Sequence, residues 1–163
     1  MQSFFKLKPF HIYNIILFIL FSLIVNKNQN LIILYYSIYS AFHILLIYLG
    51  IYHYRSILFI IYFLYGLILD ILLFNEIGPH LLVFMITLIF LKLLLKYLYG
   101  LNSFKIYILL IFMQSLMIFS EIFLGYIFFD FKFDFIFFIK IIILCMILSY
   151  PIFILFSKID QIK

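Results

Sequence analysis

Apolar residues along this chain fall into six long runs that are separated by short breaks containing polar residues, glycine or proline. A bilayer core of about 30 Å needs roughly 20 apolar residues in helix. Backbone groups in lipid must be hydrogen-bonded within the chain, so runs of this length are helical rather than extended. The pattern predicts transmembrane helices over residues 10–25, 31–51, 57–74, 80–99, 104–129 and 135–156.

Composition supports this prediction. Hydrophobic residues make up 69% of the chain, charged residues only 10%, and mean hydropathy is +1.34. A soluble domain carries roughly a quarter charged residues, and a soluble fold of this composition would expose large apolar patches and aggregate. We therefore expect an all-α integral membrane protein. It would form one transmembrane domain over residues 1–163, a bundle of about six helices with short loops.

Two local features could suggest something else. Lys6 and Lys8 precede the first run as in a signal peptide, but no small-residue cleavage site follows it, so we expect this run to be a retained span. Cys145 lies inside an apolar run, which favours a buried small hydrophobe over a disulfide, a metal ligand or a reactive thiol.

The net charge of +5 does not indicate nucleic-acid binding, because the basic residues are dispersed singly between apolar runs. Six spans place both termini on one side. That side would hold Lys6, Lys8, Arg55, Lys92, Lys96, Lys105, Lys158 and Lys163, whereas the other would hold Lys27, Lys132 and Lys140. The excess of basic residues predicts that both termini are cytoplasmic.

Three ionisable residues fall inside predicted spans, at similar depths in the half of the membrane away from the termini: Asp70, Glu121 and Lys140. Charges at depth are costly and usually face a partner inside the bundle. One hypothesis is that Lys140 neutralises Glu121 or Asp70. The alternative is that Lys140 extends to the interface while Asp70 lies at the level of the lipid headgroups.

The third and fourth runs predict a helical hairpin. Gly66 and Asp70 are four residues apart and share a helix face, and a glycine there lets another helix approach closely. Gly78 and Pro79 predict a tight turn with proline at the start of the next helix.

No catalytic residue, cofactor or metal ligand is predicted. Asp70, Glu76 and His80 are close in sequence, but a polar turn accounts for Glu76 and His80 without chemistry. There is no His pair at i,i+4 with a glutamate, no serine-centred elbow and no glycine-rich phosphate loop. The remaining histidines are scattered: His11, His43 and His53.

The hairpin resembles the rod shape-determining MreD family. Members of that family typically show a Gly-Leu-x-x-Asp helix followed by a Leu-Gly-x-x-x-Leu turn, and this chain has Gly66 to Asp70 and then Gly78. Tyr150-Pro151 is similar to the Tyr-Pro that interrupts the family's final helix. Pro79 departs from the pattern, which has an apolar residue after the glycine.

The resemblance implies a non-enzymatic scaffold of the bacterial cell-elongation complex in the inner membrane. Its partners would be an MreC-like membrane protein, an actin-like MreB filament and enzymes of peptidoglycan synthesis. The residues expected to have structural or partner-binding roles are Gly66, Asp70, Gly78, Glu121, Lys140 and Pro151.

Two other functions are compatible with a chain of this kind. In a small-molecule transporter, or the substrate-binding subunit of a vitamin uptake system, Asp70, Gln114 and Glu121 would line a polar cavity. A membrane-embedded lipid-modifying enzyme would need a cluster of carboxylates or histidines, which the sequence does not convincingly supply.

Overall fold

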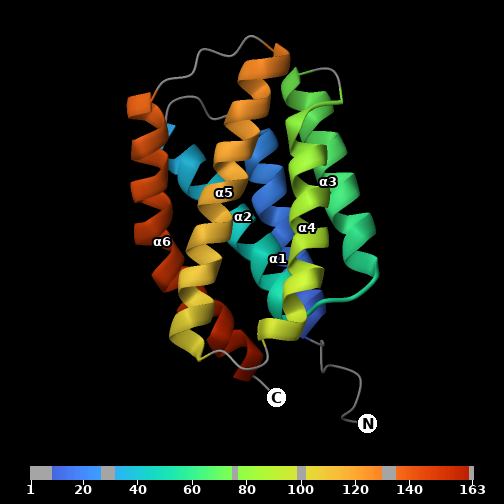
Figure 1. Ribbon diagram of the computed structural model, residues 1–163, viewed down its shortest axis with the longest axis vertical. Coiled ribbons are helices and arrows are strands. Elements are labelled where there is room, and N and C mark those ends of the chain that lie inside the picture. The colour runs from blue at the N-terminus through green and yellow to red at the C-terminus, as the bar shows by residue number, and fades with distance from the viewer. Residues whose placement is uncertain (1–8, 27–31, 75–76, 99–101, 130–134, 162–163) are drawn as a thin grey trace.

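The structure is a computed structural model that describes residues 9–26, 32–74, 77–98, 102–129 and 135–161. These residues form six helices (Figure 1), which are α1 Pro9–Val25, α2 Ile32–Tyr52, α3 Ile57–Phe74, α4 Pro79–Leu98, α5 Ser103–Phe129 and α6 Phe135–Gln161. The six predicted helices are confirmed. Their bounds agree with the prediction to within one residue, except that α6 continues to Gln161.

The helices define a multi-pass membrane protein. Helices α2, α4, α5 and α6 are long and apolar enough to cross a bilayer, and α1 and α3 are shorter apolar helices. At a rise of about 1.5 Å per residue, the 17 residues of α1 extend about 26 Å, close to the thickness of the hydrocarbon core.

Helix α2 is the core of the bundle. It contacts each of the other five helices, and every residue from 42 to 51 is buried. A helix that is apolar on all sides must be surrounded on all sides. In contrast, α4 and α6 keep large side chains such as Ile86 and Ile147 exposed on the outside of the bundle, where lipid would solvate them.

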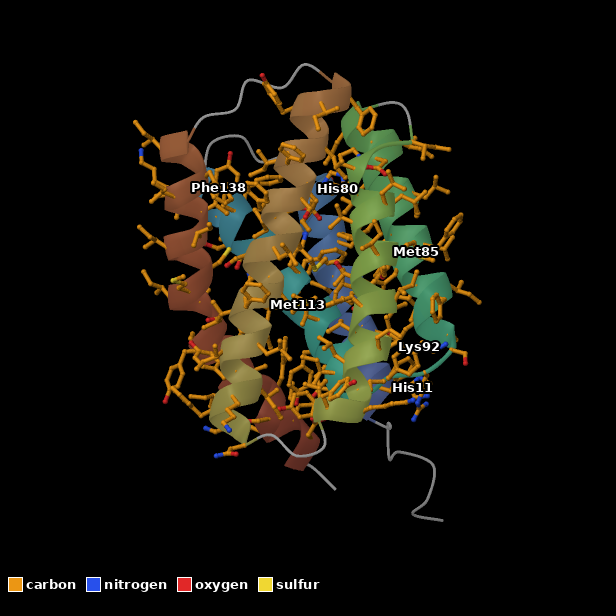
Figure 2. All side chains as sticks on the ribbon, in the orientation of Figure 1. His11, His80, Met85, Lys92, Met113 and Phe138 are labelled. Carbon is orange, nitrogen blue, oxygen red and sulfur yellow. The ribbon has the colours of Figure 1, made fainter. Side chains whose placement is uncertain are left out.

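Helix α1 begins and α6 ends at the same end of the bundle (Figure 1), here called the terminal end; the opposite end is the distal end. The predicted placement of the two ends on one side is therefore confirmed. Lys92 extends toward the terminal end (Figure 2), where its Nζ lies 5.8 Å from the centre of the Phe59 ring. Of the six lysines and arginines in the described segments, Lys140 alone belongs to the distal half.

Helices α3 and α4 pack closely at Gly66, as predicted. A Cβ atom added to Gly66 would lie 2.7 Å from the Cα and 3.0 Å from the backbone nitrogen of Leu81. Both atoms belong to the backbone of α4, which cannot move aside as a side chain can. Gly66 therefore sets the distance between the two helices of the hairpin.

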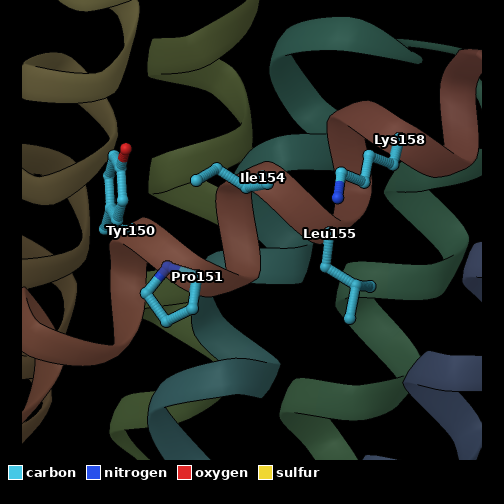
Figure 3. Close-up of a pocket in the computed structure, with 5 residues that line it drawn as sticks. All are labelled: Tyr150, Pro151, Ile154, Leu155 and Lys158. Carbon is cyan, nitrogen blue, oxygen red and sulfur yellow. The ribbon is translucent and has the colours of Figure 1, made fainter.

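Helix α6 passes through Pro151 without interruption, contrary to the expectation from the Tyr-Pro pair, and changes direction there (Figures 1 and 3). Proline has no N–H to donate to the carbonyl of Ile147, and its ring crowds that carbonyl, so the helix bends. The bend leaves a groove of about 350 Å³ on the outside of the helix (Figure 3), lined by Tyr150, Pro151, Ile154, Leu155 and Lys158. Beyond the bend, α6 turns under the bundle toward α1 and α2.

The close approach at Gly66 gives a first prediction. Gly66→Ala is expected to destabilise the protein by about 1–3 kcal/mol, because the new methyl group must push α4 away from α3. The measurement is the free energy of unfolding in mixed detergent micelles. Gly50→Ala is the matched control, since its Cβ would meet Leu91 Cδ1 and Tyr62 Oη, side-chain atoms that can move. Equal losses for both variants would contradict the prediction.

Candidate functional site: two buried histidine–carboxylate networks

Each acidic side chain in the described segments is hydrogen-bonded to a histidine. Asp70 meets His80 at 2.8 Å, Glu121 meets His43 at 2.8 Å, and Asp160 meets His53 at 2.9 Å. Tyrosine hydroxyls complete the arrangement around the carboxylates. The three pairs belong to two networks, one in the distal half of the bundle and one at the terminal end.

Asp70 caps the N-terminus of α4 from the neighbouring helix. Its Oδ1 accepts the backbone N–H of His80 and its Oδ2 that of Leu81, both at 2.9 Å. First-turn N–H groups have no partner within their own helix and are usually capped by a Ser, Thr, Asp or Asn side chain at the preceding position. Here that position is Gly78, which has no side chain, and Pro79 has no N–H. A carboxylate also suits the positive end of the helix dipole.

The same carboxylate orients the His80 ring, whose Nδ1 lies 2.8 Å from Asp70 Oδ1. Asp70 is fully buried and His80 is 4% exposed. The interpretation of His80 as part of a polar turn is therefore wrong, as is the placement of Asp70 at headgroup level. Glu76 lies outside the described residues.

From His80 the hydrogen bonds continue into the bundle. His80 Nε2 lies 3.0 Å from the hydroxyl oxygen of Tyr39, and this hydroxyl donates to Glu121 Oε2 at 2.6 Å. Glu121 Oε1 lies 2.8 Å from His43 Nε2, and His43 Nδ1 lies 2.8 Å from the backbone carbonyl of Tyr39. We call Asp70, His80, Tyr39, Glu121 and His43 the distal network. It joins α2, α3, α4 and α5.

The partners determine which atoms carry hydrogen. The Tyr39 carbonyl can only accept, so His43 Nδ1 is the donor, and one proton remains to be shared between His43 Nε2 and Glu121. Because the Tyr39 hydroxyl gives its hydrogen to Glu121, His80 Nε2 must donate to Tyr39. One proton is likewise shared between His80 Nδ1 and Asp70. Each pair then has zero net charge, which lowers the cost of burying it in lipid.

Lys140 is not the partner of either carboxylate. It is exposed near the start of α6, and in the segments that the structure describes the ion pairs of Asp70 and Glu121 are those with His80 and His43. The hypothesis that Lys140 neutralises one of them is wrong. The exposed position agrees with the alternative for Lys140, in which its stem extends to the interface.

Gln114 is bonded separately from Asp70 and Glu121. Its Nε2 donates to Ser40 Oγ at 2.7 Å and to the Ser40 carbonyl at 3.2 Å, while its buried Oε1 has no hydrogen-bond partner in the described part of the chain. Asp70 and Glu121 are joined through His80 and Tyr39 instead. The three residues expected to line a transport cavity thus belong to two different sets of hydrogen bonds.

The second network surrounds Asp160 at the terminal end. Tyr13 donates to Asp160 Oδ1 at 2.7 Å, Tyr48 donates to Oδ2 at 2.5 Å, and His53 Nε2 lies 2.9 Å from Oδ1. Tyr13, Tyr48, His53 and Asp160 are here called the terminal network. The bend at Pro151 carries Asp160 to α1 and α2, so the proline acts by directing the end of α6 into this network.

An apolar layer separates the two networks along α2. Phe42, Leu45, Leu46 and Ile47 are fully buried between His43 and Tyr48. The one polar contact that the structure describes in this layer is the Tyr62 hydroxyl, which donates to the Leu46 carbonyl at 2.5 Å. The two networks are therefore not joined by hydrogen bonds through the middle of the membrane.

The sequence interpretation missed Tyr39, His43, His53 and Asp160. A signal for His43 was present, because it lies inside the second apolar run and an ionisable residue at depth calls for a partner. The positions of Tyr39 and His43, four residues apart on one helix face, added to that signal. Nothing in the local pattern indicated that Glu121, 78 residues away, is the partner.

The described residues contain no group of three or more His, Cys, Asp and Glu side chains that could hold a metal ion. No protein-family model, curated protein or solved structure matches the chain. The class of protein rests on its own architecture, a multi-pass helical membrane protein with its ionisable side chains paired inside the bundle.

A second prediction concerns the cap on α4. Asp70→Ala leaves two backbone N–H groups and the His80 ring without their acceptor, so we expect a loss of about 3–5 kcal/mol, as for a broken buried pair. Asp70→Asn keeps one acceptor oxygen and should lose less. The free energy of unfolding in mixed micelles checks both. Lys140→Gln, which removes an exposed charge, should leave stability unchanged; a loss as large as that of Asp70→Ala would refute the assignment.

A third prediction concerns Pro151. Pro151→Ala restores the missing N–H, so α6 should straighten and its end should move away from α2. Nitroxide labels at Arg55 and Lys158 in a Cys145→Ser background should report a longer mean distance by electron–electron double resonance. Leu155→Ala, on the same groove but without a backbone effect, should leave the distance as it is. An unchanged distance in Pro151→Ala would show that the proline does not direct α6.

Proposed function

We propose that this protein is a non-enzymatic scaffold of the bacterial cell-elongation complex, similar to members of the MreD family. The observation that carries the proposal is the α3–α4 hairpin, in which the residues of the resemblance have structural work. Gly66 permits the close contact with Leu81, Gly78 precedes the capped helix, and Asp70 supplies the cap. The motif thus builds a rigid pair of helices and leaves no carboxylate free for chemistry.

The outer surface of this hairpin suits contact with another membrane helix. Ile60 and Ile71 of α3 and Ile86 and Leu93 of α4 are all exposed. Association of helices in lipid depends on shape and close packing, because lipid tails are as apolar as leucine. A hairpin with a fixed shape and an apolar surface offers such a contact to an MreC-like membrane protein.

The engagement of the buried carboxylates also favours a scaffold over a transporter. A transported ligand would need polar groups that can exchange partners, whereas Asp70 and Glu121 are held by histidines and Tyr39 of the same chain. The basic residues at the terminal end support an inner-membrane protein with cytoplasmic termini. In that orientation the hairpin turn between α3 and α4 faces the periplasm, where the cell wall is made.

The test is depletion of the protein in its native host followed by complementation with variants. Depletion should turn rod-shaped cells round, and the tagged protein should co-purify with an MreC-like protein. Ile86→Trp, on the hairpin surface at 62% exposure, should weaken that co-purification several-fold and fail to restore the rod shape. Ile147→Trp, on α6 at 65% exposure, is the matched control and should restore it.

Depleted cells that keep their rod shape and lose uptake of one small molecule would overturn the scaffold proposal in favour of transport. Equal behaviour of the two tryptophan variants, with rounding on depletion, would show that the partner contacts a surface other than the hairpin.

A further inference from the structure

We propose that the distal network is a proton relay, which takes up a proton at the Asp70–His80 pair and passes it through Tyr39 to the Glu121–His43 pair. The inference stands on four hydrogen-bonded contacts in series. Their lengths are 2.8 Å from Asp70 to His80, 3.0 Å from His80 to Tyr39, 2.6 Å from Tyr39 to Glu121 and 2.8 Å from Glu121 to His43. It is independent of the scaffold role.

The transfer step balances without any co-reactant. The His80 Nε2–H bond breaks as a bond forms between that proton and the Tyr39 hydroxyl oxygen. The original Tyr39 O–H bond breaks as its proton binds Glu121 Oε2. No electron is gained or lost, and Tyr39 is neutral before and after, with its hydroxyl turned toward His80. Uptake of one proton from water by the Asp70–His80 pair then restores that pair, so the network as a whole has gained one proton.

The network leads from the distal end toward the middle of the bilayer. At about 1.5 Å per residue, Asp70 lies about 6 Å from the distal end of α3, and Glu121 about 12 Å from the distal end of α5. His43 lies about 16 Å from the distal end of α2, which is roughly half of a 30 Å hydrocarbon core. A proton that passes from Asp70 to Glu121 therefore moves inward from the membrane surface.

The relay is closed at its inner end. Beyond His43 the fully buried side chains of Phe42, Leu46 and Ile47 form the apolar layer that separates the two networks. A proton that reaches Glu121 must leave by the way it entered, so the network loads and unloads from the distal side without making the membrane leaky. Such a site responds to the pH of the distal compartment alone.

Other ionisable groups face the network and belong to its electrostatic surroundings. Tyr35 stacks on Tyr39 with ring centres 6.3 Å apart, and its neighbour Tyr36 contacts Tyr35 edge to face. Tyr35 and, on α6, Cys145 both lie within electrostatic range of Glu121. The ionisable groups contributed by α3, α4 and α5 are Asp70, His80 and Glu121 of the relay.

The experiment uses the full chain in lipid vesicles, oriented with the terminal end in the lumen, and time-resolved infrared spectroscopy after rapid acidification outside. In the wild type a carboxylic-acid C=O band should appear, and Glu121→Gln should remove it. Tyr39→Phe should slow its appearance about 100-fold, the usual scale for loss of a positioned proton-transfer group. Tyr62→Phe, which removes a buried hydroxyl outside the network, should behave as the wild type.

Three results would overturn the proposal. One is a band that survives Glu121→Gln and disappears in Asp70→Asn, because the proton would then stop at the outer pair. Another is a wild-type rate in Tyr39→Phe. The third is a Glu121 band of equal size when the lumen is acidified instead. The Glu121→Gln and lumen measurements remain decisive if Tyr39→Phe does not fold, which circular dichroism of each variant determines.

Discussion

The hydrogen bonds between the Asp70 carboxylate and the first turn of α4 are the contacts on which the other buried polar groups depend. A helix that begins with Gly78 and Pro79 has no side chain of its own to receive the N–H groups of His80 and Leu81, and lipid offers no water to take their place. Asp70 meets this need from the preceding helix. In doing so it holds His80 in the orientation from which its ring reaches Tyr39 and, through Tyr39, the Glu121–His43 pair.

This constraint also explains why histidine rather than lysine is the partner of the buried acids. A histidine and a carboxylate that share one proton are neutral as a pair whichever of them holds it, so burial does not depend on a lasting separation of charge. The compact ring also has two nitrogens, so that His43 and His80 each bond to two neighbours at once. A lysine such as Lys140 instead has a long flexible stem that can carry its charge to the interface.

Helix α2 organises the whole bundle, because both networks are attached to it. Tyr39 and His43 lie in its distal half and Tyr48 at its terminal end, with an apolar layer between them. The scaffold proposal and the proton relay use different parts of this design. The outer surface of the hairpin would contact a partner, while its inner surface is bonded to α2 and α5. A change in the protonation of the distal network would therefore act on the same hairpin that the partner contacts.

The sequence by itself determined the features that depend on residues close together in the chain. Run length in an apolar solvent determined the six helices, Pro79 the start of α4, and Gly66 the close approach of α3 and α4, since each follows from local backbone chemistry. Only the tertiary structure decided the partners of the carboxylates and the direction of α6 beyond Pro151. Asp160 meets Tyr13 from 147 residues away, and a hydropathy pattern does not specify which faces of distant helices meet. The buried acids named from the sequence were thus the right residues, but the groups that neutralise them came from the packing around α2.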